Sequence, residues 1–137
     1  MSIRQPDRQT DSLASLPVPE HVLRYHLVWA TRRKRAVLVG EVAERADALL
    51  RQAAREQGCE VESLEVGPEC VHIVLTAPPD RSPQQLVAAM KRESYAELKD
   101  EAEVAKGPSL WTRQFLASTE PVGVDRQRAF VEEQPSV

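Results

Sequence analysis

The sequence predicts an α+β domain, a ferredoxin-like sandwich in which an antiparallel sheet carries its helices on one face. Runs rich in β-forming residues alternate with two long amphipathic runs in the order β-α-β-β-α-β-α, which is the order of that fold. The length of 137 residues suits one compact domain. A hydrophobic fraction of 42% and a charged fraction of 28% are typical of a globular protein that buries its own core.

The first half of the chain supplies a strand and a helix. Residues 22–31, VLRYHLVWAT, form a short apolar run rich in β-formers and predict the first strand. Residues 41–57 predict a helix, and Gly58 is a natural stop for it. The apolar residues at helical spacing in this segment are Val42, Ala46, Leu49, Leu50 and Ala53.

Two further strands and a second helix follow. Residues 59–66 alternate as a strand does, and residues 71–77, VHIVLTA, give the strongest strand signal and predict a central strand. Ser82 is a suitable N-cap for the next helix, with Pro83 at its first position. The buried stripe expected of that helix is Leu86, Val87, Met90 and Leu98.

The last elements come after a break at Gly107-Pro108. Residues 111–119 predict the last strand, and residues 125–134 a short final helix capped by Asp125. Residues 1–20 are polar, end in a segment with Pro17 and Pro19, and are expected to be a flexible leader to a domain over residues 21–137. With no secretory signal and no membrane-length apolar run, we expect a cytoplasmic protein without membrane contact.

Charge and cysteines narrow the candidate sites. The net charge of −3 and the pI near 5.7 argue against a strongly basic binder of duplex DNA. Locally, however, Arg32, Arg33, Lys34 and Arg35 form a basic run that could grip the phosphates of a single strand or could simply be solvated. Cys59 and Cys70 have no zinc-finger or CxxC spacing and are expected to be free thiols.

Several segments, in order along residues 22–134, resemble the IS200/IS605-type transposases, which cut and rejoin single-stranded DNA. The similar segments are Tyr25-His26-Leu27-Val28-Trp29, Glu65 to His72, Ala77-Pro78-Pro79 with Ser82-Pro83, Leu86-Val87, Met90-Lys91, Ser94, Leu110-Trp111, Ser118-Thr119 and Phe130 to Gln134. The resemblance implies a homodimer, a single-stranded or hairpin DNA partner (RNA is an alternative) and a Mg²⁺ or Mn²⁺ cofactor. It also implies an active site at residues 70, 72, 130 and 134.

Two of those positions depart from the family's pattern. The resemblance places the nucleophilic tyrosine four residues before a glutamine ligand, and here those positions are Phe130 and Gln134. Phenylalanine has no oxygen with which to form a phosphotyrosine. The His-x-His metal motif is Cys70-Val71-His72, whose thiol suits Zn²⁺ better than Mg²⁺. The sequence therefore predicts a degenerate catalytic site.

Each candidate residue also has a structural interpretation. Cys70 and His72 could bind zinc with Gln134, or be a buried thiol beside a hydrogen-bonded histidine. Tyr25 and Tyr95 could replace the nucleophile, and Trp29 and Trp111 could stack on bases, but all four positions favour packing. The favoured function is a catalytically inactive binder of single-stranded DNA. The alternatives are a dimeric protein-interaction module and a residual metal-dependent nuclease.

Overall fold

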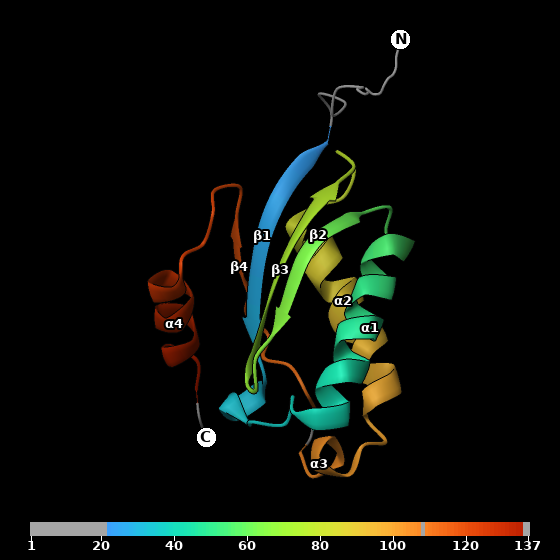
Figure 1. The fold of residues 1–137 in the computed structure, drawn as a ribbon, viewed down its shortest axis with the longest axis vertical. Helices are drawn as coiled ribbons and strands as arrows, with labels where there is room; N and C mark the ends of the chain where they lie inside the picture. The colour runs from blue at the N-terminus through green and yellow to red at the C-terminus, as the bar shows by residue number, and fades with distance from the viewer. Residues whose placement is uncertain (1–21, 108, 136–137) are drawn as a thin grey trace.

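The computed structural model describes residues 22–107 and 109–135, and its centre is a four-stranded sheet (Figure 1). The strands are β1 (Leu23–Ala30), β2 (Glu60–Val66), β3 (Cys70–Ala77) and β4 (Leu116–Ser118). They lie in the order β2-β3-β1-β4, and each neighbouring pair is antiparallel. This is the ferredoxin-like arrangement, so the predicted fold class and the central place of β3 are confirmed.

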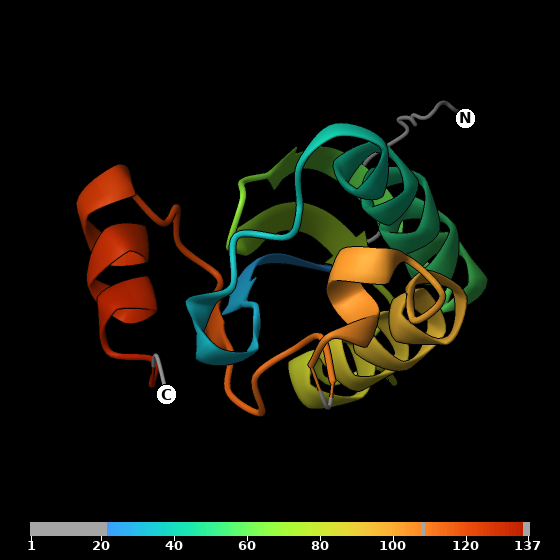
Figure 2. The same cartoon turned by 90° about the horizontal axis from the view of Figure 1, so that it is seen from below.

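Two long helices cover one face of the sheet, α1 (Gly40–Glu56) and α2 (Pro83–Leu98), and Figure 2 shows them together on that side. Between them and the sheet lies the inner core, which includes the predicted helix residues Ala46, Leu50, Ala53, Leu86, Val87, Met90 and Leu98. Gly58 follows α1 with a φ of +83°, a conformation that glycine adopts without steric cost. A short helix, α3 (Ala102–Ala105), precedes the break at Gly107.

The predicted start of α2 is confirmed. Ser82 accepts a hydrogen bond from the backbone nitrogen of Gln85, and the Gln85 side chain accepts one from the Ser82 nitrogen. This capping box satisfies two backbone donors that a helix start would otherwise leave open. Pro83 occupies the first turn, where its missing N–H is no loss.

The fourth helix lies on the opposite face of the sheet, which we call the outer face. α4 (Val124–Glu132) begins after Gly123, one residue earlier than expected, and stands beside β1 and β4 (Figures 1 and 2). Phe130 and Val131 of α4 pack against Val28 of β1 in a small second cluster. The prediction that the helices lie on one face therefore holds for α1 and α2, while α4 covers part of the other.

The last strand is shorter than the prediction of 111–119. Trp111 forms only an isolated bridge with Thr31, and regular pairing is confined to Leu116–Ser118. The intervening backbone bonds to a side chain instead, because the Lys91 ammonium donates to the carbonyls of Thr112 (2.6 Å) and Gln114 (3.2 Å). The segment is thereby drawn towards α2.

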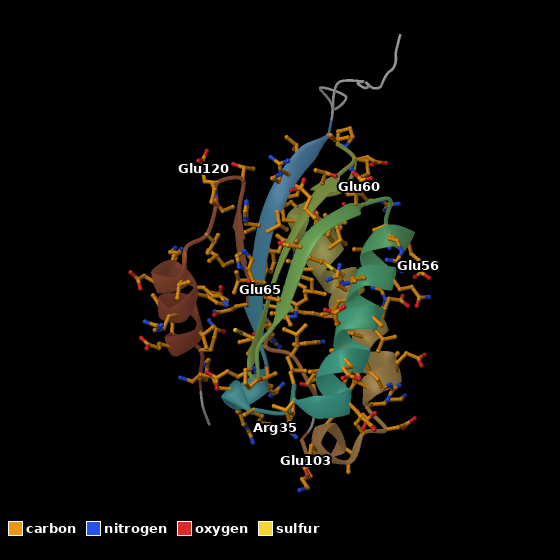
Figure 3. The ribbon with its side chains drawn as sticks, viewed as in Figure 1. Arg35, Glu56, Glu60, Glu65, Glu103 and Glu120 are labelled. Carbon is orange, nitrogen blue, oxygen red and sulfur yellow. The ribbon has the colours of Figure 1, made fainter. Side chains whose placement is uncertain are left out.

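Strand β2 is an edge of the sheet and is strongly acidic. Its register with β3 shifts between Val61 and Ser63, so Glu62 occupies a bulge. Glu60, Glu62 and Glu65 are exposed, and Figure 3 labels Glu60 and Glu65 along this strand. Glu62 also accepts from the Arg24 guanidinium at 3.0 Å across the sheet.

The predicted flexible leader, residues 1–20, lies outside the described residues. Within the part of the chain that the structure describes, none of the helices has the length and apolar character needed to cross a membrane.

Candidate nucleic-acid site

The predicted pair Cys70 and His72 lies on the outer face, beneath α4. The two residues are separated by one position on β3, so their side chains project to the same side of the sheet. The glutamine in contact with them is Gln127 of α4. Its oxygen lies 3.2 Å from His72 Nδ1, and its nitrogen lies 3.5 Å from Cys70 Sγ.

This donor set does not fit the hard metal ion that the resemblance implies. Burial is the largest influence on the Cys70 thiol and raises its pKa. The hydrogen bond from Gln127 lowers this pKa, and the nearby carboxylates of Glu69 and Glu65 raise it, so that the net shift is upward. A neutral thiol is a poor ligand, and Mg²⁺ and Mn²⁺ prefer oxygen donors. Over the described residues, no group of three or more His, Cys, Asp or Glu side chains is placed to hold an ion.

A second histidine lies beside this cluster. The rings of His26 and His72 are 5.9 Å apart between centroids. Burial, with the His72 ring and Arg24 as further causes, lowers the pKa of His26. His72 Nε2 and His26 Nδ1 are both buried without a hydrogen-bond partner in the described parts of the chain.

Phe130 and Gln134 lie on the same side of the C-terminal segment. Phe130 is 7% exposed and packs on Val28, so its ring fills space between α4 and the sheet. The Gln134 side chain is not the one bonded to Cys70 and His72. Gln134 is 3% exposed, and its nitrogen donates to the Phe130 carbonyl at 3.2 Å. That bond orients the amide, and its Oε1 is buried without a hydrogen-bond partner among the described residues.

The basic run divides into two pairs. The Lys34 ammonium donates to the Glu132 carbonyl (3.4 Å), and the Arg35 guanidinium donates to the Glu103 carbonyl, beside which Figure 3 shows it. Both side chains therefore bind other segments of the domain. Arg32 and Arg33 are exposed, and within the described part of the chain only Arg32 of the two has a side-chain hydrogen bond, to Ser109 at 3.3 Å. These two are the members of the run open to a ligand.

The backbone of this run is held in a strained conformation. Arg33 and Lys34 have φ values of +59° and +53°, which cost about 1–2 kcal/mol for each non-glycine residue. Thr31 fixes the turn, since its hydroxyl donates to the Arg35 carbonyl at 2.7 Å and its nitrogen to the Glu69 carbonyl. Strained residues over-determined by their surroundings gather at ligand sites.

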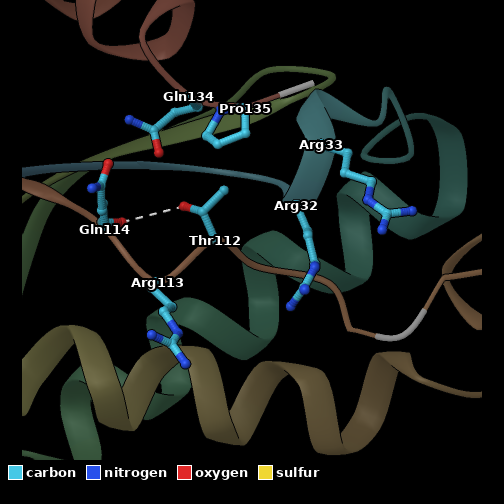
Figure 4. Close-up of a pocket in the computed structure, with 7 residues that line it drawn as sticks. All are labelled: Arg32, Arg33, Thr112, Arg113, Gln114, Gln134 and Pro135. Atoms are coloured by element: carbon cyan, nitrogen blue, oxygen red, sulfur yellow. Dashed lines mark hydrogen bonds between the residues drawn. The ribbon is translucent and has the colours of Figure 1, made fainter. Parts of the chain in front are cut away.

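Arg32 and Arg33 are among the residues that line a pocket of about 310 Å³ (Figure 4). We call it the arginine pocket, and it is lined by Arg32, Arg33, Thr112, Arg113, Gln114, Gln134 and Pro135. Three segments distant in sequence meet there: the turn after β1, the segment held by Lys91, and the residues after α4. Considering only described residues, none of its arginines is paired with a carboxylate.

The aromatic candidates belong to the inner core. Trp29 is fully buried, Trp111 is 7% exposed, and their rings meet edge to face with centroids 5.9 Å apart. Tyr25 and Tyr95 pack against the same core. The packing interpretation therefore describes all four.

Sequence reasoning missed Gln127, Arg113 and Lys91. The sequence could have pointed to Gln127, because it lies three residues before Phe130 and seven before Gln134 and therefore shares their helix face. No sequence pattern pointed to Arg113, because it lies within a segment predicted to be a strand. Lys91 was noted only as part of a resemblance.

The protein is a ferredoxin-like domain with polar side chains on its outer face. They form the cluster of Cys70, His72 and Gln127 under α4 and the arginine pocket next to the end of α4. Residues 20–134 match the family model described as "Transposase IS200 like". The chain belongs to this IS200-like transposase family. It is 36% identical over 104 residues to the ISDra2 transposase TnpA of Deinococcus radiodurans, covering 71% of this chain and 72% of the relative.

Solved structures agree with this assignment. A crystal structure from Deinococcus radiodurans R1, presented as that of a transposase, superposes with a TM-score of 0.77 at 31% identity, covering 88% of this chain and 97% of that one. The REP-associated tyrosine transposase bound to a REP hairpin shares the fold, with a TM-score of 0.54 at 14% identity. That match covers 80% of this chain and 62% of the other.

Proposed function

We propose that this protein binds single-stranded, hairpin-forming DNA and does not cleave it. The observation that carries the proposal is Phe130, an apolar ring packed against Val28 at the position that the resemblance assigns to the nucleophile. α4 contains no tyrosine, and the two tyrosines of the chain, Tyr25 and Tyr95, pack against the inner core instead. A phosphotyrosine intermediate has no oxygen to form on at residue 130.

The arrangement of Cys70, His72 and Gln127 supports the same proposal. The amide of Gln127 makes a hydrogen bond with each of its two neighbours, Cys70 and His72. The side chains at positions 70 and 72, which the resemblance assigns to the metal site, thus belong to an internal hydrogen-bond cluster. Family membership and the hairpin seen bound to a protein of the same fold support DNA as the partner.

The test of inactivity is a search for a covalent adduct. The protein is incubated with labelled hairpin DNA and Mg²⁺ or Mn²⁺ and run on a denaturing gel, where we expect no protein-linked label. The double variant Phe130→Tyr with Cys70→His restores the missing oxygen and a second imidazole, and we expect it to regain an adduct. An adduct from the unaltered protein would refute the proposal.

We also propose that the protein is a homodimer, as the resemblance implies, and that it is cytoplasmic. The net charge of −3 and the acidic edge strand β2 favour one other function, a dimeric protein-interaction module without nucleic-acid binding. Light scattering together with a hairpin titration separates the two functions. A dimer that binds neither DNA nor RNA at low salt would support the module, because phosphate contacts are strongest there.

A further inference from the structure

We infer that Lys91 is a positioning residue for DNA binding: its ammonium holds the two carbonyls that flank Arg113 and thereby fixes where the Arg113 guanidinium meets a DNA phosphate. This inference rests on the proposed function and adds a residue of α2 that acts through Arg113 instead of touching the DNA itself. Three observations support it: an irregularity in the pairing of the sheet, the bonds that Lys91 makes there, and the exposure of Arg113.

The chain that pairs with β1 through β4 leaves the sheet for a few residues before β4 begins. Thr31, just after β1, faces Trp111, and Val28 of β1 faces Leu116. β1 therefore advances by three residues where the facing chain advances by five, so the facing chain carries two residues more than the pairing needs. We call residues 112–115 the edge bulge. Bulges at sheet edges re-aim side chains and are over-represented next to functional sites.

Lys91 takes the place of a neighbouring strand for the edge bulge. Its ammonium donates to the carbonyls of Thr112 (2.6 Å) and Gln114 (3.2 Å), the residues immediately before and after Arg113. Hydrogen bonds from a charged donor are about twice as strong as those between neutral groups. Because both carbonyls converge on one cation, the backbone of Arg113 is held from both sides.

Stability alone does not explain a lysine at this position. Burial lowers the pKa of Lys91 to about 8, which means that its ammonium has given up part of its hydration. Over the residues described, no carboxylate is paired with Lys91 to offset that cost. An apolar side chain would fill the same space without desolvating a charge. The charge is explained by the two carbonyls that it holds in place.

α2 holds the start of the edge bulge at a second point. Ser94 lies three residues after Lys91, on the same side of the helix, and its Oγ accepts from the Trp111 indole nitrogen at 2.9 Å. Trp111 is the residue just before the edge bulge. Consecutive positions of the chain are therefore fixed to one face of α2, and a rigid helix sets the place of the edge bulge.

The edge bulge presents Arg113 to a ligand. Thr112 is buried and Phe115 packs against the inner core, whereas Arg113 and Gln114 between them are exposed. Arg113 lines the arginine pocket, and no described carboxylate pairs with it. A guanidinium is the side-chain group best suited to phosphate oxygens. When its backbone is already fixed, less freedom is lost on binding, so Lys91 should raise the affinity that Arg113 supplies.

The test is a double-mutant cycle read by fluorescence anisotropy with a labelled DNA hairpin, between about 50 and about 200 mM NaCl. We expect Lys91→Met and Arg113→Gln each to weaken binding about tenfold and to lower the slope of log Kd against log salt by about one, because each removes the same phosphate contact. The double variant should be no weaker than Arg113→Gln alone.

Two further variants separate positioning from charge. Lys91→Arg, whose guanidinium can donate to both carbonyls, should keep most of the affinity. Lys99→Met makes the same change at an exposed lysine after the end of α2 and should bind as the unaltered protein does. Circular dichroism checks that each variant is folded, and Lys91→Gln takes the place of Lys91→Met in the cycle if that variant does not fold.

A double variant about tenfold weaker than Arg113→Gln, with the slope lowered by about two, would overturn this inference, because Lys91 would then act on the DNA through its own charge. Unchanged binding by Lys91→Met, or an equal loss in Lys99→Met, would overturn it as well. In each of these cases the hairpin still binds and the proposed function stands. If the unaltered protein binds no hairpin, the proposed function falls and this inference falls with it.

Discussion

Replacing Ser94 with alanine removes a buried hydroxyl that joins α2 to the segment leading to the arginine pocket. Ser94 is fully buried, and its Oγ accepts from the Trp111 indole nitrogen at 2.9 Å while donating to the Met90 carbonyl at 2.7 Å. In Ser94→Ala the indole N–H of Trp111 stays buried but no longer has a hydrogen-bond acceptor. The Met90 carbonyl, by contrast, still has its bond within the helix.

The expected loss follows from these contacts. An orphaned buried donor costs about 1–3 kcal/mol, and alanine returns roughly 0.5 kcal/mol through its higher helix propensity. We therefore expect the free energy of unfolding to fall by about 1–2 kcal/mol. Urea unfolding followed by circular dichroism measures it, because a typical urea slope of about 1–3 kcal/mol/M makes such a change a visible midpoint shift.

A double-mutant cycle tests the reason for the loss. In a Trp111→Phe background no indole N–H remains, so Ser94→Ala should cost little there and the coupling energy should be about 1 kcal/mol. Equal losses in the two backgrounds would mean that the bond between Ser94 and Trp111 does not stabilise the fold, and the argument from the orphaned donor would be refuted.

Three further predictions concern single side chains. Burial lowers the pKa of Lys91 from 10.5 to about 8, so between those pH values the unfolded chain binds more protons and stability should rise with pH. The free energy of unfolding, taken relative to that of Lys91→Met, should rise by about 1–2 kcal/mol over this range, because the group is partly exposed. Urea titrations in which the difference between the two proteins does not change with pH would contradict this. Ser82→Ala should lower the free energy of unfolding by about 1 kcal/mol through loss of the cap, measured by thermal or urea unfolding; an unchanged midpoint would count against it. Burial raises the pKa of Cys59 to about 11, so native alkylation at pH 8, read by mass spectrometry, should modify the half-buried Cys70 first, and the reverse order would be inconsistent with the fold.

The sequence predicted the parts of the fold that local patterns control. The apolar spacing of residues 41–57 and the Ser82-Pro83 start specify α1 and α2, because an amphipathic helix and its cap are encoded within a few residues. The last strand was predicted too long for a non-local reason. The carbonyls of Thr112 and Gln114 are taken by Lys91, a contact across twenty residues or more that no local pattern reveals.

The candidate site shows the same limit. Spacing alone placed Cys70 and His72 on one face of a strand, and the structure brings them together. Which glutamine meets them depends on how α4 sits on the outer face, and there Gln127, not Gln134, is in reach. The arginine pocket was beyond sequence reasoning, because Arg113 and Gln134 reach it from segments more than twenty residues apart.

The bulged, glutamate-bearing edge at β2 has a consequence for self-association through the sheet. A regular, uncharged edge strand invites another chain to continue the ladder, and this one is guarded by a register shift at Glu62 and by the like charges of Glu60 and Glu65. Two such edges would repel each other at neutral pH. Without these three carboxylates the repulsion would disappear, and the same strand would become the place where sheets from two molecules can join into aggregates.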